Sequence, residues 1–292
     1  MMLNTNTRRI SLPESVKHSV RSVHSALGQA TRGVRTLPTF VVAGAQRCGT
    51  TSLFWSLAQH PQVAGPPLRK GVHYFDTDYH RGLDWYRGHF PLRALVRPGS
   101  GRPRIEVGES SPYYLFHPLA AERLARDLPG VKVVVMLRDP VERAYSAHSH
   151  EFARGFETEP FERALELEPE RLRGEEERLR SDPAARSHSH QHHAYLARGR
   201  YAEQLRRLER HLGRHRMHVI ESEAFFAAPE RVFAGVEDFL GIAHCERIRF
   251  SRHNARPRQG MPEHLRARLA DHFADPDSDL AAWWGRAPVW RQ

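Results

Sequence analysis

The amino-acid sequence predicts an α/β fold, in which one parallel β-sheet is covered by helices on both faces. Short apolar runs, such as residues 40–45 and 133–137, have the length of buried strands and alternate with helical stretches. No apolar run approaches the roughly 20 residues that a membrane span needs. The 292 residues suffice for a single domain with a sizeable core. The alternation argues against a strand-rich sandwich and against a pure helical bundle.

The expected strands and helices follow one another from residue 39 onward. The first strand, 39–45, leads through a tight loop into the first helix, 50–59, which ends before Pro61. Further strands are expected at residues 71–75, 104–109, 132–138 and 218–221. Further helices are expected at residues 119–128, 141–154, 201–212 and 230–240.

Two stretches carry a weaker pattern. Residues 157–182 are rich in Glu and Arg, and their incomplete apolar stripe indicates a solvated helical excursion. That stripe consists of Phe161, Leu165, Leu167 and Leu172. A histidine cluster follows at His188, His190, His192 and His193. Its spacing is irregular and it contains no Cys or acidic residue, so we interpret it as a polar loop rather than a metal site, and we expect no metal.

Residues 1–36 form a basic arm ahead of the domain expected over 37–292. The arm holds six Lys or Arg residues against one acid, Glu14, and its apolar residues recur at helical spacing. A basic amphipathic helix can make weak contact with a membrane surface or dock on a partner. The apolar face here is short and lacks aromatic residues, which favours an arm packed on its own domain or left loose.

The overall charge indicates an acidic partner without naming it. Lys and Arg number 44 against 34 Asp and Glu, which gives a net charge of +10, and all but three of the basic residues are arginine. The arginines are dispersed among glutamates rather than interleaved with aromatic residues, so we expect no nucleic-acid binding. Two cysteines, Cys48 and Cys245, and an N-terminus without a contiguous apolar segment predict a reducing, cytoplasmic location.

The most informative segment runs from Gly44 to Ser52, with the sequence GAQRCGTTS. Its first glycine follows the buried strand, and its hydroxyl residues open a helix. Backbone N–H groups in such a loop converge on an anion, and the helix N-terminus adds positive potential. The spacing matches the nucleotide-binding P-loop, but Thr50 occupies the position where that motif requires lysine. The loop therefore suits a phosphate-like group and makes ordinary ATP hydrolysis a poorer fit.

A second anion-binding pair is expected after the strand at 132–138. Arg138 ends that strand, Pro140 begins the next helix, and Ser146 lies about one and a half turns into it. Ligands in open α/β sheets bind at the carboxyl ends of the strands. An arginine and a serine that converge there suit a second phosphate.

Together, these two segments resemble the signature of sulfotransferases that use 3′-phosphoadenosine 5′-phosphosulfate (PAPS), in the bacterial branch related to heparan-type glycan sulfotransferases. The similarity extends over roughly residues 37–290 and includes segments at 70–76, 108–114, 199–205 and 218–241. It implies a P-loop-type sheet, PAPS as co-substrate and no metal. It also implies a set of residues that bind PAPS: Arg47, Cys48, Gly49, Thr50, Thr51, Ser52, Arg138, Ser146, Tyr201 and Arg256.

The chain departs from the family at the general base. Many relatives have a glutamate where this chain has Gly71. By analogy, Arg47 and Lys70 would stabilise the transferred group. His73 and Glu109 are the two alternatives for the base, because either could face the same cleft and remove a proton.

The expected function is transfer of the sulfuryl group of PAPS to a carbohydrate, a glycolipid or a glycosylated metabolite. The acceptor atom would be a hydroxyl oxygen, with an amine as the second choice. Thr50 counts against one alternative, a P-loop nucleotide kinase. Gly71 is the best support for another, a catalytically inactive nucleotide-binding scaffold. The acceptor, the oligomeric state and the role of residues 1–36 are not readable from the sequence.

Overall fold

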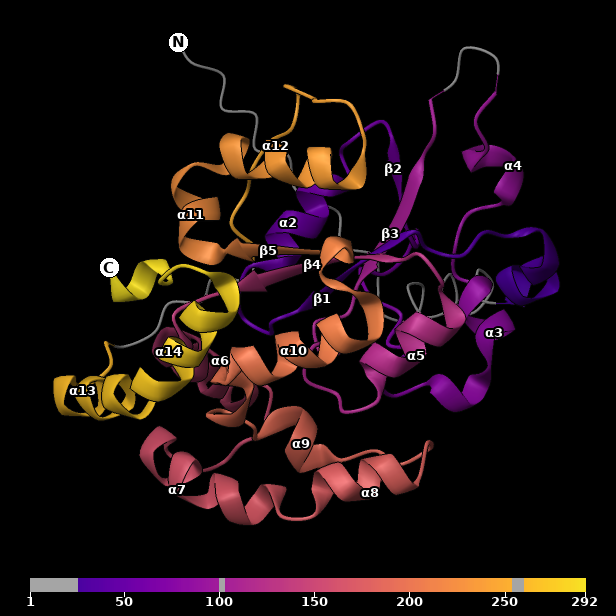
Figure 1. Ribbon diagram of the computed structural model, residues 1–292. Coiled ribbons are helices and arrows are strands. Elements are labelled where there is room, and N and C mark those ends of the chain that lie inside the picture. Colours follow the sequence, from indigo (N-terminus) through magenta and orange to yellow (C-terminus); the bar gives the residue numbers. More distant parts are fainter. Residues whose placement is uncertain (1–25, 100–102, 254–259) are drawn as a thin grey trace, which may run out of the picture.

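Five parallel strands form one sheet in the computed structural model, which describes residues 26–99, 103–253 and 260–292 (Figure 1). The strands are β1 (Phe40–Gly44), β2 (Val63–Ala64), β3 (Glu106–Ser110), β4 (Lys132–Leu137) and β5 (Met217–Glu221), in the spatial order β2-β3-β1-β4-β5. Every pairing is parallel, with Val41 opposite Glu109 on one side and Val133 on the other. The predicted α/β fold is confirmed.

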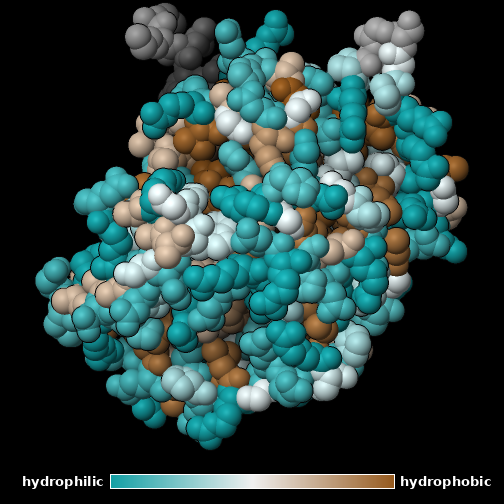
Figure 2. Space-filling model, in the orientation of Figure 1, coloured by the Kyte–Doolittle hydropathy of each residue, from teal (hydrophilic) through white to brown (hydrophobic). Residues whose placement is uncertain are grey.

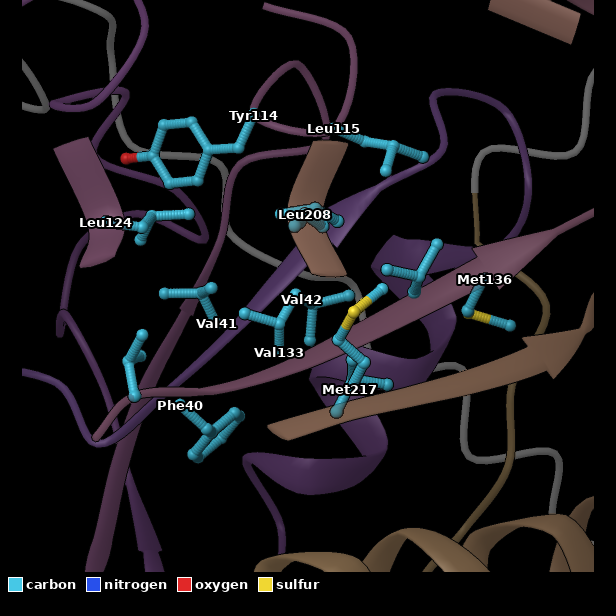
Figure 3. Packing of buried hydrophobic residues seen from close by; sticks show 14 of the residues in the cluster. Phe40, Val41, Val42, Tyr114, Leu115, Leu124, Val133, Met136, Leu208 and Met217 are labelled. Carbon is cyan, nitrogen blue, oxygen red and sulfur yellow. The ribbon is translucent and has the colours of Figure 1, made fainter. Parts of the chain in front are cut away.

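The core lies on both faces of the central strands. All five residues of β1 are buried, and so are Val133 to Leu137 of β4. Figure 3 shows Phe40, Val41 and Val42 of β1 among side chains from β4 and the neighbouring helices. Burying one such side chain contributes about 1.5–3 kcal/mol. Continuous apolar runs are typical of strands that are covered on both faces, and for this reason they were recognisable in the sequence.

Helices cover the two faces of the sheet (Figure 1). One face carries α2 (Thr50–Leu57), α11 (Ser222–Ala227) and α12 (Pro229–Leu240). The other carries α5 (Ala120–Asp127), α6 (Pro140–Phe152), α10 (Tyr201–Leu212), α13 (Glu263–His272) and α14 (Ala274–Trp284). Short 3-10 helices lie at η1 (Arg32–Val34), η2 (Tyr79–Arg81), η3 (Ala197–Gly199), η4 (Arg214–Arg216) and η5 (Val289–Arg291).

The helical excursion forms an additional layer beyond α6 and α10 (Figure 1). It consists of α7 (Phe161–Leu172), α8 (Glu175–Ser181) and α9 (His188–His192). Figure 2 shows mainly hydrophilic residues over α7 and α8. Phe161 and Leu165 nevertheless pack with Val141 of α6 in a second apolar cluster. The prediction of a polar loop at 188–193 is wrong, because most of this stretch forms the short helix α9.

The last residues of the predicted basic arm pack on the domain. Residues 26–30 are helical, and Gln29 donates a hydrogen bond to the carbonyl of Trp85. Arg35 donates to the carbonyl of Phe90, and Trp85 lies in α3 (Leu83–Arg87), which precedes α4 (Arg93–Val96). Residues 1–25, which hold most of the predicted amphipathic helix, lie outside the described residues.

One predicted strand is wrong. Residues 71–75 form no strand but an irregular segment with turns, in which His73 has a φ of +60°. The segment still lies beside the end of β3, because Ser110 donates its N–H to the carbonyl of Lys70 over 2.9 Å. A single backbone contact and side-chain hydrogen bonds replace a regular ladder here, and β2 is the edge strand instead.

Candidate active site

The phosphate-type loop and the Arg138 segment meet at the carboxyl edge of neighbouring strands. The loop follows β1, Arg138 follows β4, and β1 pairs directly with β4. Residues from both segments line one pocket of about 850 Å³. Parallel sheets bind ligands at this edge, where adjacent loops diverge.

The loop has the backbone shape of an anion cradle. Arg47 and Gly49 both have positive φ, at +71° and +91°. At Gly49 an added Cβ would lie 3.1 Å from the ring of Phe226, in a conformation that side chains rarely adopt, so glycine is required there. Helix α2 begins at the next residue, and its first N–H groups have no partner within the helix. A helix start of this kind favours an anion in the pocket.

Side chains join the two segments. The Nε atom of Arg47 donates to the hydroxyl of Ser146 over 3.1 Å. The guanidinium of Arg138 contacts the carboxylate of Glu142 at 3.2 Å, and Tyr201 donates its hydroxyl proton to the carbonyl of Arg138 over 2.8 Å. Arg47, Arg138 and Ser146 therefore line the same pocket from separate elements, as the sequence predicted.

Lys70 brings a third cation to this pocket. Its ammonium contacts the hydroxyls of Thr50 at 3.5 Å and Ser110 at 3.3 Å, and it has no ion-pair partner among the described residues. Burial lowers the pKa of Lys70 to about 8, although the charge of Glu109 opposes the shift. A half-buried ammonium beside a helix N-terminus, without a carboxylate, is suited to an anionic ligand.

His73 is held by a buried carboxylate. Its Nδ1 lies 2.9 Å from an oxygen of Asp76, whose side chain is fully buried. Burial alone lowers the pKa of His73, but the charge and hydrogen bond of Asp76 outweigh it, so the pKa is raised. Asp76 accepts this bond, so the proton lies on Nδ1 and the Nε2 lone pair remains for a ligand. His73 lines the pocket.

Glu109 does not face the cleft, and the expectation that it does is wrong. Its side chain is fully buried, and both carboxylate oxygens are occupied. The hydroxyls of Tyr86 and Tyr114 donate to one oxygen, over 2.8 and 2.7 Å. The backbone N–H of Val72 and the hydroxyl of Ser111 donate to the other, each over 2.7 Å. Four donors leave Glu109 no capacity to take a proton from an acceptor, and its role is to fix the segment that carries Lys70 and His73.

Comparison with known proteins shows to which family the chain belongs. A model of the sulfotransferase domain matches residues 37–265. The chain belongs to this sulfotransferase family. A sulfotransferase from Alicyclobacillus acidocaldarius has a crystal structure that is 31% identical to this chain, with a TM-score of 0.65 over 88% of this chain and 100% of that one.

Two curated relatives are more distant or much longer. The membrane-associated sulfotransferase kil1 of Dictyostelium discoideum is 26% identical over 87% of this chain and 67% of its own length. A bifunctional heparan sulfate N-deacetylase/N-sulfotransferase of Drosophila melanogaster is 28% identical over 75% of this chain, which corresponds to only 21% of that protein. Within the described residues of this sulfotransferase domain, no helix is long and apolar enough to cross a membrane.

Gly71, where many sulfotransferases have a glutamate, is packed too closely for any side chain. A Cβ at this position would lie 2.4 Å from the carbonyl oxygen of Ser110 and 2.6 Å from the hydroxyl of Ser111. The domain therefore has no room for a carboxylate here without a backbone shift. His73, two residues further on, lines the pocket and has a basic atom, Nε2, that Asp76 does not use.

Three residues implied by the family resemblance lie behind the pocket rather than in it. The hydroxyl of Ser52 is buried and accepts the N–H of His253 over 2.9 Å. The thiol of Cys48 is fully buried, so only its backbone is placed in the loop. Tyr201 donates its hydroxyl proton to the carbonyl of Arg138 and does not line the pocket. Gly49, Thr50 and Thr51 do line it, and Arg256 lies outside the described residues.

Sequence reasoning missed two walls of the pocket. One wall comes from the end of α6 and from α9 with the turn after it: Ser149, His150, Arg154, Gln191, His192 and Arg198. The other has Ser222, Glu223, Phe226 and Ala227 after β5, together with Arg252 and His253 from the segment just before Arg256, which the family resemblance had already placed near the donor. The second wall was recoverable, because it follows a strand end. The first depends on long-range packing of the excursion. Across the described ranges, no three His, Cys, Asp or Glu residues are grouped to hold a metal.

Proposed function

We propose that this domain transfers the sulfuryl group of PAPS to a hydroxyl oxygen of a carbohydrate-bearing acceptor, with an amine as the second choice. The observation that carries the proposal is Lys70, a half-buried ammonium that contacts the hydroxyls of Ser110 and of Thr50, at the start of α2, and pairs with no carboxylate in the described part of the chain. An anionic donor in the loop supplies the missing counter-charge. The relation to glycan sulfotransferases supports the acceptor class.

The donor is proposed to bind along the carboxyl edge of the sheet. Arg47 and the N–H groups at the start of α2 hold the 5′-phosphosulfate. Arg138 and Ser146 hold the 3′-phosphate. Phe226, which already carries Arg252 at 4.5 Å from its ring centre, provides an apolar face for the adenine.

Transfer then needs alignment and one proton acceptor. The acceptor oxygen attacks sulfur in line, the bond between sulfur and the bridging oxygen breaks, and 3′-phosphoadenosine 5′-phosphate (PAP) leaves. Nε2 of His73 takes the hydroxyl proton, and Asp76 stabilises the imidazolium that forms. Lys70 and Arg47 stabilise the negative charge that develops on the bridging oxygen.

Two other functions fit the site less well. A nucleotide kinase needs a lysine at the position of Thr50, and Lys70 approaches the loop from another segment. An inactive scaffold was suggested by Gly71, but the His73–Asp76 pair supplies a base that does not depend on that position.

The test is transfer of radiolabelled sulfate from PAPS to defined acceptors. We expect the wild-type protein to label N-desulfated heparin, dextran or a nitrophenyl glucoside. Lys70→Met, which keeps the aliphatic stem and removes the charge, should lower the rate at least about 100-fold. Lys132→Met is the matched control, because Lys132 does not line the pocket: its ammonium donates to the carbonyl of Leu240 and lies 5.6 Å from the ring centre of Phe239. The absence of transfer to every acceptor, or an unimpaired Lys70→Met protein, would refute the proposal.

A further inference from the structure

A second imidazole in the pocket is held by a second buried carboxylate. Glu151, on the last turn of α6, is fully buried. One of its oxygens lies 3.0 Å from Nδ1 of His192 on α9. Burial alone raises the pKa of Glu151, but the hydrogen bond and charge of His192, with the charges of His150 and Arg154, outweigh it, so the pKa is lowered. The carboxylate therefore stays ionised and accepts the Nδ1 proton, and Nε2 of His192 remains available to a ligand.

The same carboxylate is tied to the phosphate-type loop. The other oxygen of Glu151 accepts from the side-chain amide of Gln46 over 3.0 Å. The amide oxygen of Gln46 accepts from Arg198 over 2.8 Å. Gln46 precedes Arg47, so this chain of hydrogen bonds fixes the position of His192 relative to the loop. The His192 ring also packs at 4.4 Å from the ring of Phe156, and its side chain is 12% exposed.

His192 stands apart from the proposed donor contacts. Those contacts lie on the loop after β1, at Arg138 and Ser146, and on the wall after β5. His192 lines the same pocket with His150 and Gln191, and its partner Glu151 lies five residues beyond Ser146 along α6. Because the two phosphates of the donor are assigned to other residues, we assign a ligand group that reaches His192 to the acceptor.

We infer that His192, oriented by Glu151, hydrogen-bonds the acceptor and selects acceptors that carry several polar groups, such as sugars. This inference rests on the proposed function. His73 takes the proton of the reacting hydroxyl, and Nε2 of His192 holds a second hydroxyl of the same acceptor. A simple phenol has no second group to offer, so it gains nothing from His192.

The inference is tested by comparing sugar and phenol acceptors in His192→Ala. We expect KM for a nitrophenyl glucoside to rise about tenfold or more, the effect of one lost hydrogen bond, while KM for 4-nitrophenol stays within about twofold. The affinity for PAP, measured by calorimetry, should be unchanged. His192→Gln, whose amide can replace Nε2, should recover part of the loss.

His188→Ala is the matched control. His188 lies on the same short helix and packs 4.7 Å from the His192 ring, but it is exposed and does not line the pocket. Equal losses in both variants, equal losses with sugar and phenol, or a parallel loss of PAP affinity would overturn the inference and leave the proposed function standing. A wild-type protein that transfers sulfate to no acceptor would overturn both.

Discussion

Lys70 and His73 lie three residues apart, and their pKa values move toward each other. Burial brings the pKa of Lys70 down to about 8, while Asp76 raises the pKa of His73 above its ordinary value. In the proposed mechanism, His73 must be neutral and Lys70 charged. The two shifts therefore narrow the range of pH in which the free enzyme is competent.

The first prediction is a narrow bell-shaped dependence of kcat/KM on pH. Activity should fall below the raised pKa of His73, because the base is then protonated, and should fall above about pH 8, where Lys70 loses its charge. Asp76→Asn should move the acidic limb to lower pH, because the shift that Asp76 causes is lost. Asp78→Asn, which affects a carboxylate paired with Arg186, is the control and should leave both limbs in place. A flat profile across this range would contradict both roles.

The second prediction separates the two former candidates for the base. His73→Ala should lower kcat by about 10²- to 10⁴-fold with unchanged PAP affinity. Glu109→Gln should instead lower the free energy of unfolding by about 3 kcal/mol, because an amide cannot accept from all four donors. Turnover assays and thermal unfolding on both variants decide the matter. A stable Glu109→Gln protein that has lost turnover would reverse the assignment.

Residue positions were predictable where a motif determines them. Arg47, Arg138 and Ser146 line the pocket because strand ends and a helix start fix their location. Glu109 and Tyr201 were misplaced, since a motif gives a neighbourhood but not the direction of a side chain. The directions of both side chains are set by hydrogen bonds to residues far away in the sequence: Glu109 accepts from Tyr86, and Tyr201 donates to the carbonyl of Arg138.

At the scale of elements, the segment 70–77 leans against the end of β3 instead of forming a strand. Two contacts hold this segment in place. The backbone N–H of Val72 donates to the buried carboxylate of Glu109, and Gly71 packs closely against Ser110. Contacts of this kind leave no periodic pattern in the sequence, so they cannot be predicted from it. The position of His73 therefore depends on a packing distance at a neighbouring glycine.

The third prediction concerns that glycine. Gly71→Ala should destabilise the fold by about 1–3 kcal/mol, because the new Cβ meets backbone at 2.4 Å. Gly71→Glu should not create a more active enzyme, although it restores the residue common in relatives. Gly33→Ala, with nothing within 4 Å of the added Cβ, is the control. Denaturant unfolding measures the change, and an unaltered midpoint for Gly71→Ala would refute the close packing.

The fourth prediction concerns the anchor of the excursion. Glu157 is buried and accepts from Arg171 over 2.7 Å and from Tyr195 over 3.0 Å. Burial alone raises its pKa, but these bonds and two backbone N–H groups lower it to about 2. A carboxylate with a depressed folded pKa stabilises the fold above its unfolded pKa, and this contribution is lost as the pH falls from about 4.5 toward 2.

Glu157→Gln should therefore reduce stability at pH 7 and weaken its acid dependence over that range. Glu166→Gln removes a carboxylate from an exposed pair with Arg163 and should change stability by less than about 0.5 kcal/mol. Chemical unfolding at pH 7 and pH 3 provides the measurement. The account of Glu157 fails if the two variants show the same loss at pH 7 and the same response to acid.

For the whole molecule, the topology was the most predictable level, because buried strands leave continuous apolar runs and parallel pairing follows from strand–helix alternation. The order β2-β3-β1-β4-β5 places β1 and β4 side by side, and so brings both anion-binding segments to one edge. The wall built by α9 was not predictable, because it depends on how the excursion folds back over α6. That wall is where the acceptor is expected to bind.

The central claim is that this edge binds PAPS, and calorimetric titration with PAP beside ATP and Mg²⁺ tests it most directly. PAP carries the two phosphate groups that the loop and the Arg138–Ser146 pair are proposed to hold, whereas ATP has no 3′-phosphate. We expect PAP to bind at least about 100-fold more tightly than ATP with Mg²⁺. Arg138→Ala should weaken the binding of PAP by about 10- to 100-fold. Equal or tighter binding of ATP with Mg²⁺ would contradict the account.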